Sequence, residues 1–100
     1  MRIDVQPSAL RDLREGFRFY EGQETGLGAY FLDSLFSDID SLQLFAGIHS
    51  IHFTRFYRLL SKRFPYAIYY QLEDHTALVR AVLDLRRDPK WIERKLKGLF

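Results

Sequence analysis

Basic and aromatic side chains alternate through the second half of the chain, and together they suit a polyanionic ligand. Cations attract phosphate groups and aromatic rings stack on bases, so a surface that mixes the two is typical of nucleic-acid binding. The residues alone support equally a sheet of half-buried aromatic side chains with a solvated face of arginines. The basic residues are Arg55, Arg58, Lys62, Arg63, Arg80, Arg86 and Arg87, and the aromatic ones are Tyr57, Phe64, Tyr66, Tyr69 and Tyr70.

The Cys and His content of the chain does not favour a metal site or a nucleophilic catalyst. The chain contains no Cys, which excludes disulfides, thiolate metal sites and cysteine nucleophiles. His49 and His52 are three residues apart at an expected loop-to-strand boundary, where this spacing turns them to opposite faces. His75 is expected to be exposed in a turn formed by residues 73–75. We therefore predict no metal and no cofactor.

Asp84 is the acid closest in sequence to the expected basic face. It lies between Arg80 and Arg86, whose charges would favour its ionised form. This environment favours a structural ion pair over acid catalysis.

The net charge of +2 hides a marked asymmetry. Residues 1–50 hold four Arg and eight acids, whereas residues 51–100 hold eleven Lys and Arg and five acids. Such a division predicts an acidic first half and a basic second half that faces a polyanion.

The first half reads as a short strand followed by two helices. Ile3 and Val5 alternate with polar residues before Pro7 ends the strand, and Ser8 is the expected N-cap of the first helix. The glycines of Gly26-Leu27-Gly28 suit an interhelical turn with positive backbone angles. The apolar stripes are Leu10, Leu13, Phe17 and Tyr20 in the first helix, and Leu27, Phe31, Leu35, Ile39 and Leu42 in the second.

The second half reads as three strands and a terminal helix. The strands are expected within residues 50–63, 66–73 and 76–86, and Asp88-Pro89 predicts the start of a short helix. Alternation in the last strand places Ala77, Val79, Ala81, Leu83 and Leu85 on one face. The prediction is a single α+β domain over residues 1–100: a short strand, a helical hairpin covering one sheet face, a mostly antiparallel three-stranded sheet and a short helix.

No leader or membrane segment is expected. The first residues alternate polar and apolar types, and no stretch approaches about 18 apolar residues. These features predict no membrane association and a cytoplasmic location.

Taken together, the sequence resembles the RelE/ParE family of type II toxin–antitoxin toxins, also described as plasmid-stabilisation proteins. The resemblance spans roughly residues 3–92, and its most specific part is the RFPY strand followed by RRDP behind a helical hairpin. The matching segments are ALRDL at 9–13, FY at 19–20, GLG at 26–28, FL at 31–32, KRFPYAIYY at 62–70 and AVLDLRRDP at 81–89.

The resemblance implies a growth-inhibiting toxin that forms a hetero-oligomer with a cognate antitoxin. Its target would be either DNA gyrase or ribosome-bound mRNA, and in the second case the protein would be a metal-independent endoribonuclease. Arg86 falls where the ribonuclease branch has an active-site Arg. Ala67 and Asp84 stand where that branch often has Arg and His, and its late Tyr falls near Trp91 or Ile92.

The site expected for such a nuclease has two parts. Arg86, Arg63 and Arg58 would hold phosphates, while Asp84 or His75 would move protons. Arg80, Arg87, Lys62 and Tyr69 would contact the nucleic acid or another target. The alternative is a non-toxic binding module or a degenerate toxin. Such a protein would act through partner-helix association, because Leu32, Phe36 and Leu44 widen the apolar face of the second helix.

Overall fold

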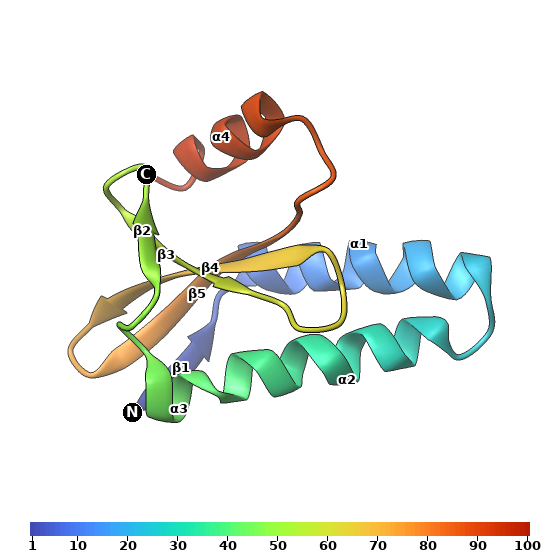
Figure 1. Cartoon of the computed structure of the whole chain (residues 1–100), viewed down its shortest axis with the longest axis horizontal. Helices are drawn as coiled ribbons and strands as arrows, with labels where there is room; N and C mark the ends of the chain where they lie inside the picture. The colour runs from blue at the N-terminus through green and yellow to red at the C-terminus, as the bar shows by residue number, and fades with distance from the viewer.

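A computed structural model describes all residues from 1 to 100 and confirms an α+β fold. A five-stranded sheet lies between a pair of long helices on one face and a short helix on the other (Figure 1). The elements are β1 (Arg2–Val5), α1 (Pro7–Gln23), α2 (Leu27–Asp40), α3 (Leu42–Phe45), β2 (Ser50–His52), β3 (Phe56–Leu60), β4 (Tyr66–Glu73), β5 (Thr76–Asp84) and α4 (Pro89–Lys97).

The sheet order is β1-β5-β4-β3-β2, so β1 and β2 form its two edges. β1 pairs in parallel with β5, and every other pair is antiparallel. The prediction of three strands in the second half is wrong because the segment 50–63 contains a hairpin. Phe53 and Thr54 adopt positive φ angles of 56° and 57° there, and no Gly, Asn or Pro announces this turn in the sequence.

The helical hairpin α1–α2 packs tightly because of two glycines. A Cβ on Gly16 would lie 2.5 Å from the Phe31 ring, and one on Gly28 would lie 2.7 Å from the Phe17 ring. Gly26 does adopt the predicted positive φ, at 91°, but Gly28 lies inside α2 and is needed for close packing instead.

α1 begins two residues earlier than predicted and closes the open edge of β5. Gln6 is the N-cap, so the prediction for Ser8 is wrong. The Ser8 hydroxyl instead donates to the carbonyl of Arg80 at 2.6 Å. Beyond Val79, β5 has no β1 partner, and the carboxylate of Asp12 accepts from the N–H of Val82 at 3.0 Å. α1 thus satisfies backbone groups that the short β1 leaves unpaired.

A β-bulge at Arg80 reverses the faces of β5. Tyr69 pairs with Ala81 while Tyr70 pairs with Val79, which leaves Arg80 as the extra residue. Ala77 and Val79 therefore join the core under α1 and α2, whereas Ala81 and Leu83 join the core under α4. The prediction that these residues share one face is wrong, because strict alternation does not survive a bulge.

α4 covers the second face of the sheet. Pro89 begins it, and the Asp88 carboxylate accepts from the N–H of Lys90 at 2.9 Å, as the sequence predicts. Ile92 and Leu96 pack on Phe56, Ala67, Tyr69, Ala81 and Leu83. The sequence suggested that the helices cover one face of the sheet, whereas the structure has helices on both faces. None of them is long and apolar enough to cross a membrane.

Candidate functional site

The sheet separates the arginines that the sequence had grouped together. Side chains alternate along β3, so Arg58 shares the face of Phe56, which packs under α4. Arg86 follows β5 and donates from Nη2 to the hydroxyl of Tyr20 on α1 at 3.2 Å. The expected single site is thus divided into two regions, one on each face.

Arg86 is already paired with Asp84. Its Nη2 lies 2.8 Å from Oδ2 of Asp84, and its Nε lies 3.0 Å from Oδ1. Partial burial acts to raise the pKa of Asp84, but hydrogen bonds from Arg86 outweigh it and lower that pKa. Hydrogen bonding to Asp84 in turn raises the pKa of Arg86. The pair is the ion pair that the sequence favoured, and it neutralises a group expected to hold phosphate.

Aromatic side chains surround this pair. The Tyr20 ring stacks on Phe31 and meets Phe64 edge-on, with centroids 5.1 and 4.9 Å away. Tyr66 lies in the same cluster, and burial, followed by the nearby Asp84 charge, raises its pKa to about 12. A phenol with this pKa stays protonated at neutral pH, so it can donate a hydrogen bond but does not act as a base.

Arg58 has a different environment on the opposite face. It lies across from Tyr69 in the β3–β4 ladder and across from Ser50 in the β2–β3 ladder. Its Nε is buried and has no hydrogen-bond partner. Burial, and then the charge of Arg58, lower the pKa of His52, which makes the imidazole neutral near pH 7. Burial also raises the pKa of Tyr69, while Arg58 opposes that shift.

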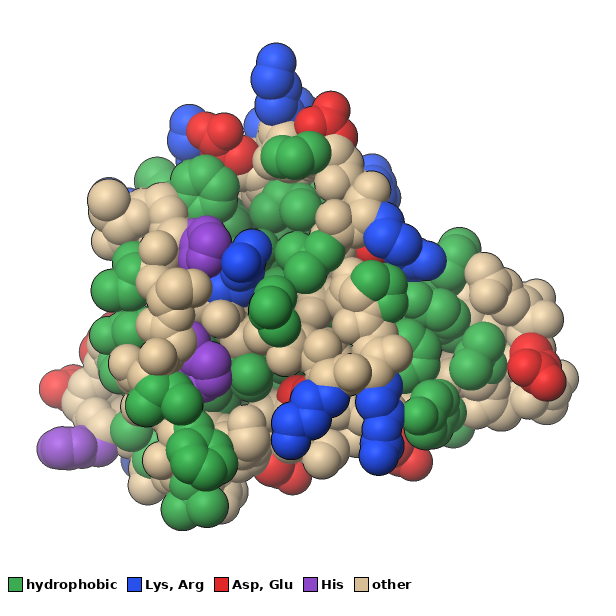
Figure 2. Space-filling model, viewed as in Figure 1, with side chains coloured by type: hydrophobic (Ala, Val, Ile, Leu, Met, Phe, Trp, Pro, Cys, Tyr) green, Lys and Arg blue, Asp and Glu red, His purple; other side chains and the backbone are tan.

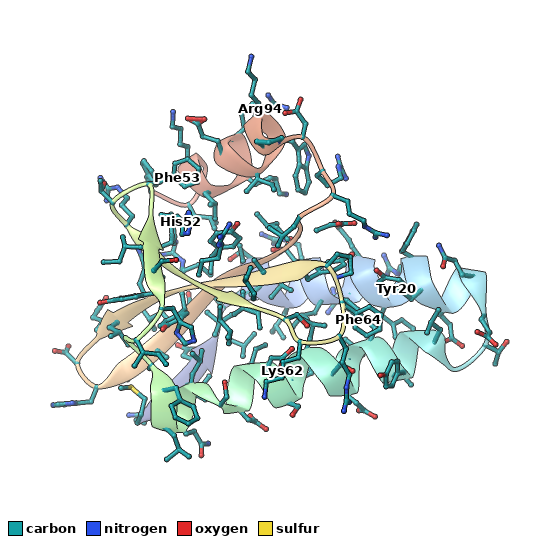
Figure 3. All side chains as sticks on the ribbon, in the orientation of Figure 1. Tyr20, His52, Phe53, Lys62, Phe64 and Arg94 are labelled. Atoms are coloured by element: carbon teal, nitrogen blue, oxygen red, sulfur yellow. The ribbon has the colours of Figure 1, made fainter.

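His52 was not among the expected site residues, because its spacing from His49 had been considered only for a metal. Figure 3 shows His52 at β2, far along the molecule from Phe64 and from Tyr20, the hydrogen-bond partner of Arg86. Recognising the hairpin at 53–55 in the sequence would have placed Ser50 opposite Arg58, and so His52 close to Arg58. His49 instead contacts the Tyr70 hydroxyl through its Nδ1.

The remaining predicted residues are dispersed. Arg80 donates to Oε1 of Gln71 and to the carbonyl of Leu99, at 2.7 and 2.8 Å. The guanidinium of Arg87 lies 3.9 Å from the Trp91 ring centroid. Lys62 and Arg63 lie in the exposed β3–β4 loop, and Arg63 is 5.9 Å from the Tyr30 ring centroid. His75 is exposed in the β4–β5 turn, as predicted.

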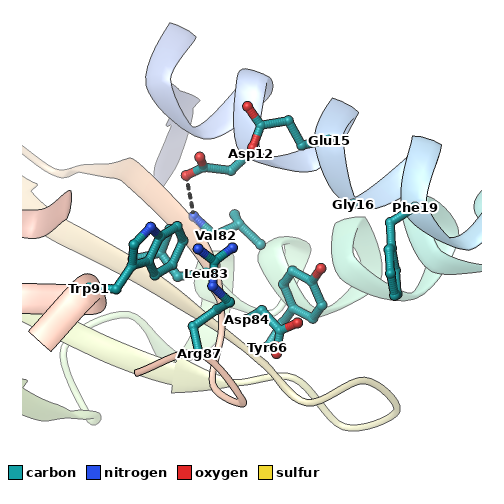
Figure 4. Close-up of a pocket in the computed structure, with 10 residues that line it drawn as sticks. All are labelled: Asp12, Glu15, Gly16, Phe19, Tyr66, Val82, Leu83, Asp84, Arg87 and Trp91. Carbon is teal, nitrogen blue, oxygen red and sulfur yellow. Dashed lines mark hydrogen bonds between the residues drawn. The ribbon is translucent and has the colours of Figure 1, made fainter. Parts of the chain in front are cut away.

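A pocket of about 250 Å³ lies between α1, the end of β5 and the start of α4 (Figure 4). Asp12, Asp84, Arg87 and Trp91 are among its lining residues. Burial raises the pKa of Asp12 to about 6, although its hydrogen bond from Val82 acts in the opposite direction. Asp12 could not be recognised as a site residue from the sequence, where it is one of several polar residues of an amphipathic helix.

Apolar side chains stand exposed along one side of the molecule. Leu44 is 83% exposed and Ile48 is 73% exposed, and Phe45, Ile51 and Phe53 are also exposed. We call these five residues the 44–53 patch. Figure 2 shows hydrophobic side chains gathered on this side, over α3 and the edge strand β2. Arg55 and Glu73 line one pocket together with Ile51, so charges of both signs border the patch.

The fold has a counterpart among solved structures. No protein-family model and no curated protein sequence matches the chain. One chain of the structure titled "Chromosomal ParDE TA system from P. aeruginosa" superimposes with a TM-score of 0.79 at 12% sequence identity. The match covers 85% of this chain and 96% of that one. At this identity the likeness concerns the fold, and it confirms the fold that the resemblance to the RelE/ParE family implied.

Proposed function

We propose that this protein is the toxin of a toxin–antitoxin pair, which arrests growth until its antitoxin binds. The observation that carries the proposal is the structural likeness to a chain of a ParDE system over nearly the whole of that chain. The motif combination in the sequence is a separate line of support. The structural likeness holds at only 12% identity, so it does not depend on shared sequence motifs.

The antitoxin would cover the 44–53 patch and form a hetero-oligomer. Large apolar side chains exposed side by side mark interaction surfaces in soluble proteins. β2 is a sheet edge of only three residues and offers free backbone groups beside the patch. Because Arg55 is the charge nearest to the patch along the chain, the covering segment would be apolar with an acidic residue facing Arg55.

The target that fits the site best is DNA gyrase, inhibited through a protein surface. Arg86 is bound to Asp84, and Arg58 lies on the other face of the sheet, so the expected phosphate-binding set is not assembled. Inhibition by surface contact requires no such assembly, and the exposed basic residues Lys62, Arg63 and Arg87 remain available for it.

One observation favours a second target, ribosome-bound mRNA. The unpartnered Nε of Arg58 lies on the same face as Tyr69, with a neutral His52 near its charge. A guanidinium with a free donor suits a phosphate, and a neutral imidazole can accept a proton. In this version the metal-independent nuclease would use Arg58 and His52 and leave Arg86 as a structural residue.

Inducible expression of the intact chain tests the toxin proposal. Growth should stop after induction and resume when the neighbouring small gene is co-expressed. Purified protein should then inhibit supercoiling by gyrase and leave mRNA on ribosomes intact. Codon-dependent mRNA cleavage that is lost in Arg58→Gln would favour the second target, with Arg94→Gln on α4 as the matched control. Normal growth despite confirmed folded expression would contradict both.

A further inference from the structure

The outer face of the α1–α2 hairpin carries a groove that the fold leaves open. The groove has a volume of about 240 Å³ and is almost entirely apolar. Leu10 and Phe36 on its walls are 41% and 38% exposed, although both helices bury their opposite sides in the core. Its lining residues are Leu10, Leu13, Arg14, Phe17, Leu32 and Phe36.

The two sides of this groove carry opposite charges. Along α1, Arg11, Arg14 and Arg18 follow one another at spacings of three and four residues and form one basic ridge. Along α2, Asp33 and Asp40 are seven residues, or about 10.5 Å, apart and form an acidic ridge. All five side chains are exposed, and none makes an ion pair or a side-chain hydrogen bond within the chain. The two ridges flank the groove without neutralising each other.

The two ridges also overlap along the length of the hairpin. Gly16 contacts Phe31 and Phe17 contacts Gly28, which fixes how the antiparallel helices are aligned. This alignment places Arg14 level with Asp33, and Arg11 between the levels of Asp33 and Asp40. A second hairpin turned over about an axis parallel to the helices would therefore oppose each ridge with the other.

We propose that the outer face of the hairpin binds a second copy of this chain, forming a symmetric four-helix interface. The argument is charge complementarity: an acidic or a basic partner could neutralise only one ridge, whereas a second copy neutralises both. A twofold axis perpendicular to the helices is disfavoured because it would bring Arg11 and Arg14 against their own copies. An isologous interface with α1 facing the α2 of the other copy places Arg14 opposite Asp33 and brings Arg11 between Asp33 and Asp40, twice over.

The expected dimer is weak and reversible. α1 has 17 residues and is about 25 Å long, so two helices side by side present roughly 500 Å² on each copy. This value lies near the lower end of specific protein interfaces. Dimer formation should therefore appear as the protein concentration rises and should decrease with added salt, which screens exposed charges.

Sedimentation equilibrium of the purified full chain tests the proposal. Arg11→Glu/Arg14→Glu and Asp33→Lys/Asp40→Lys should each raise the dimer dissociation constant at least about tenfold, because each places like charges together. An equimolar mixture of the two variants should restore the affinity as a heterodimer, since every opposed pair is again of opposite sign. Lys90→Glu/Arg94→Glu on α4 is the matched double reversal and should leave the dissociation constant unchanged.

Restored affinity in the mixture alone supports this interface, and circular dichroism of each variant shows whether it remains folded. A wild-type chain that stays monomeric at every accessible concentration overturns the proposal. A dimer that persists in both charge-reversal variants, or one that the mixture does not restore, also overturns it. The experiment measures self-association only, so its result is independent of whether the protein arrests growth.

Discussion

Arg86 binds Asp84 through two nitrogen–oxygen contacts, of 2.8 Å from Nη2 and 3.0 Å from Nε. The same Nη2 reaches the Tyr20 hydroxyl at 3.2 Å, which ties the end of β5 to α1. The arginine for which the family resemblance implied an active-site role is therefore part of the link between sheet and hairpin.

We predict that the Arg86–Asp84 pair contributes modestly to stability. Arg86 is 52% exposed, so solvent screening limits the coupling energy between the two residues to about 0.5–1 kcal/mol. A double-mutant cycle of Arg86→Gln, Asp84→Asn and the double variant, followed by urea unfolding, measures this energy. The pKa of Asp84 is lowered in the fold, so the coupling should be present at pH 7 and decline in acid. A coupling of zero at pH 7 would remove the structural role assigned to the pair.

Asp12 should make the protein more stable in mild acid. Its pKa is about 6 in the fold and 3.8 without burial, so the folded state holds the proton more tightly than the unfolded one. The free energy of unfolding should therefore fall as the pH rises from about 4 to 6, by at most about 3 kcal/mol.

The variant Asp12→Asn checks this pH dependence. The amide oxygen of Asn can still accept from Val82 but does not titrate, so the slope between pH 4 and 6 should flatten. Glu15→Gln, an exposed neighbour on the same helix, is the control. An unchanged slope in Asp12→Asn would mean that the pKa of Asp12 is not raised by burial.

The close approach of α1 to α2 predicts opposite effects at two glycines of the same helix. Gly16→Ala would place a methyl group 2.5 Å from the buried Phe31 ring and should destabilise the protein by about 1–3 kcal/mol. Gly22→Ala faces open space and should stabilise α1 by up to about 1 kcal/mol. Thermal unfolding of both variants measures the difference, and equal effects would contradict the packing described here.

A turn sequence that favours positive φ angles should stabilise the β4–β5 hairpin. Asp74 and His75 both have positive φ, at 48° and 60°, which is the type I′ geometry that Asn-Gly favours. Asp74→Asn/His75→Gly should raise the unfolding midpoint in urea, corresponding to about 0.5–1 kcal/mol. His75→Ala keeps the strained angle and should give no gain. A loss of stability in the Asn-Gly variant would show that the native side chains make contacts of their own.

The spacing of apolar residues was enough to predict most of the helices and strands, because burial in the core determines which positions are apolar. The cap at Asp88 and most of the two helical stripes agree with the structure, since each depends on local spacing. Leu10 of the first stripe is exposed, however, and Leu42 of the second lies in α3. The hairpin at Phe53 and Thr54 could not be predicted because apolar residues with positive φ leave no sequence signal.

The arrangement of the site residues could not be predicted, because it depends on strand pairing and not on local sequence spacing. The bulge at Arg80 changes which residues of β5 face α4, and a bulge is set by pairing with β4. Arg58 and Arg86 therefore end on opposite faces although both were expected on a basic surface. Asp12 owes its raised pKa to burial, and the group it bonds to, the N–H of Val82 on β5, lies seventy residues away in the sequence.

Colony counts after induction of the intact chain test the central claim most directly. The claim predicts that viability falls when the chain is expressed alone and recovers when the neighbouring small gene is co-expressed. It also predicts that Leu44→Ser/Ile48→Ser in the exposed patch weakens this rescue more than Lys90→Ser/Arg94→Ser on α4. Full viability with folded, abundant protein would contradict the account.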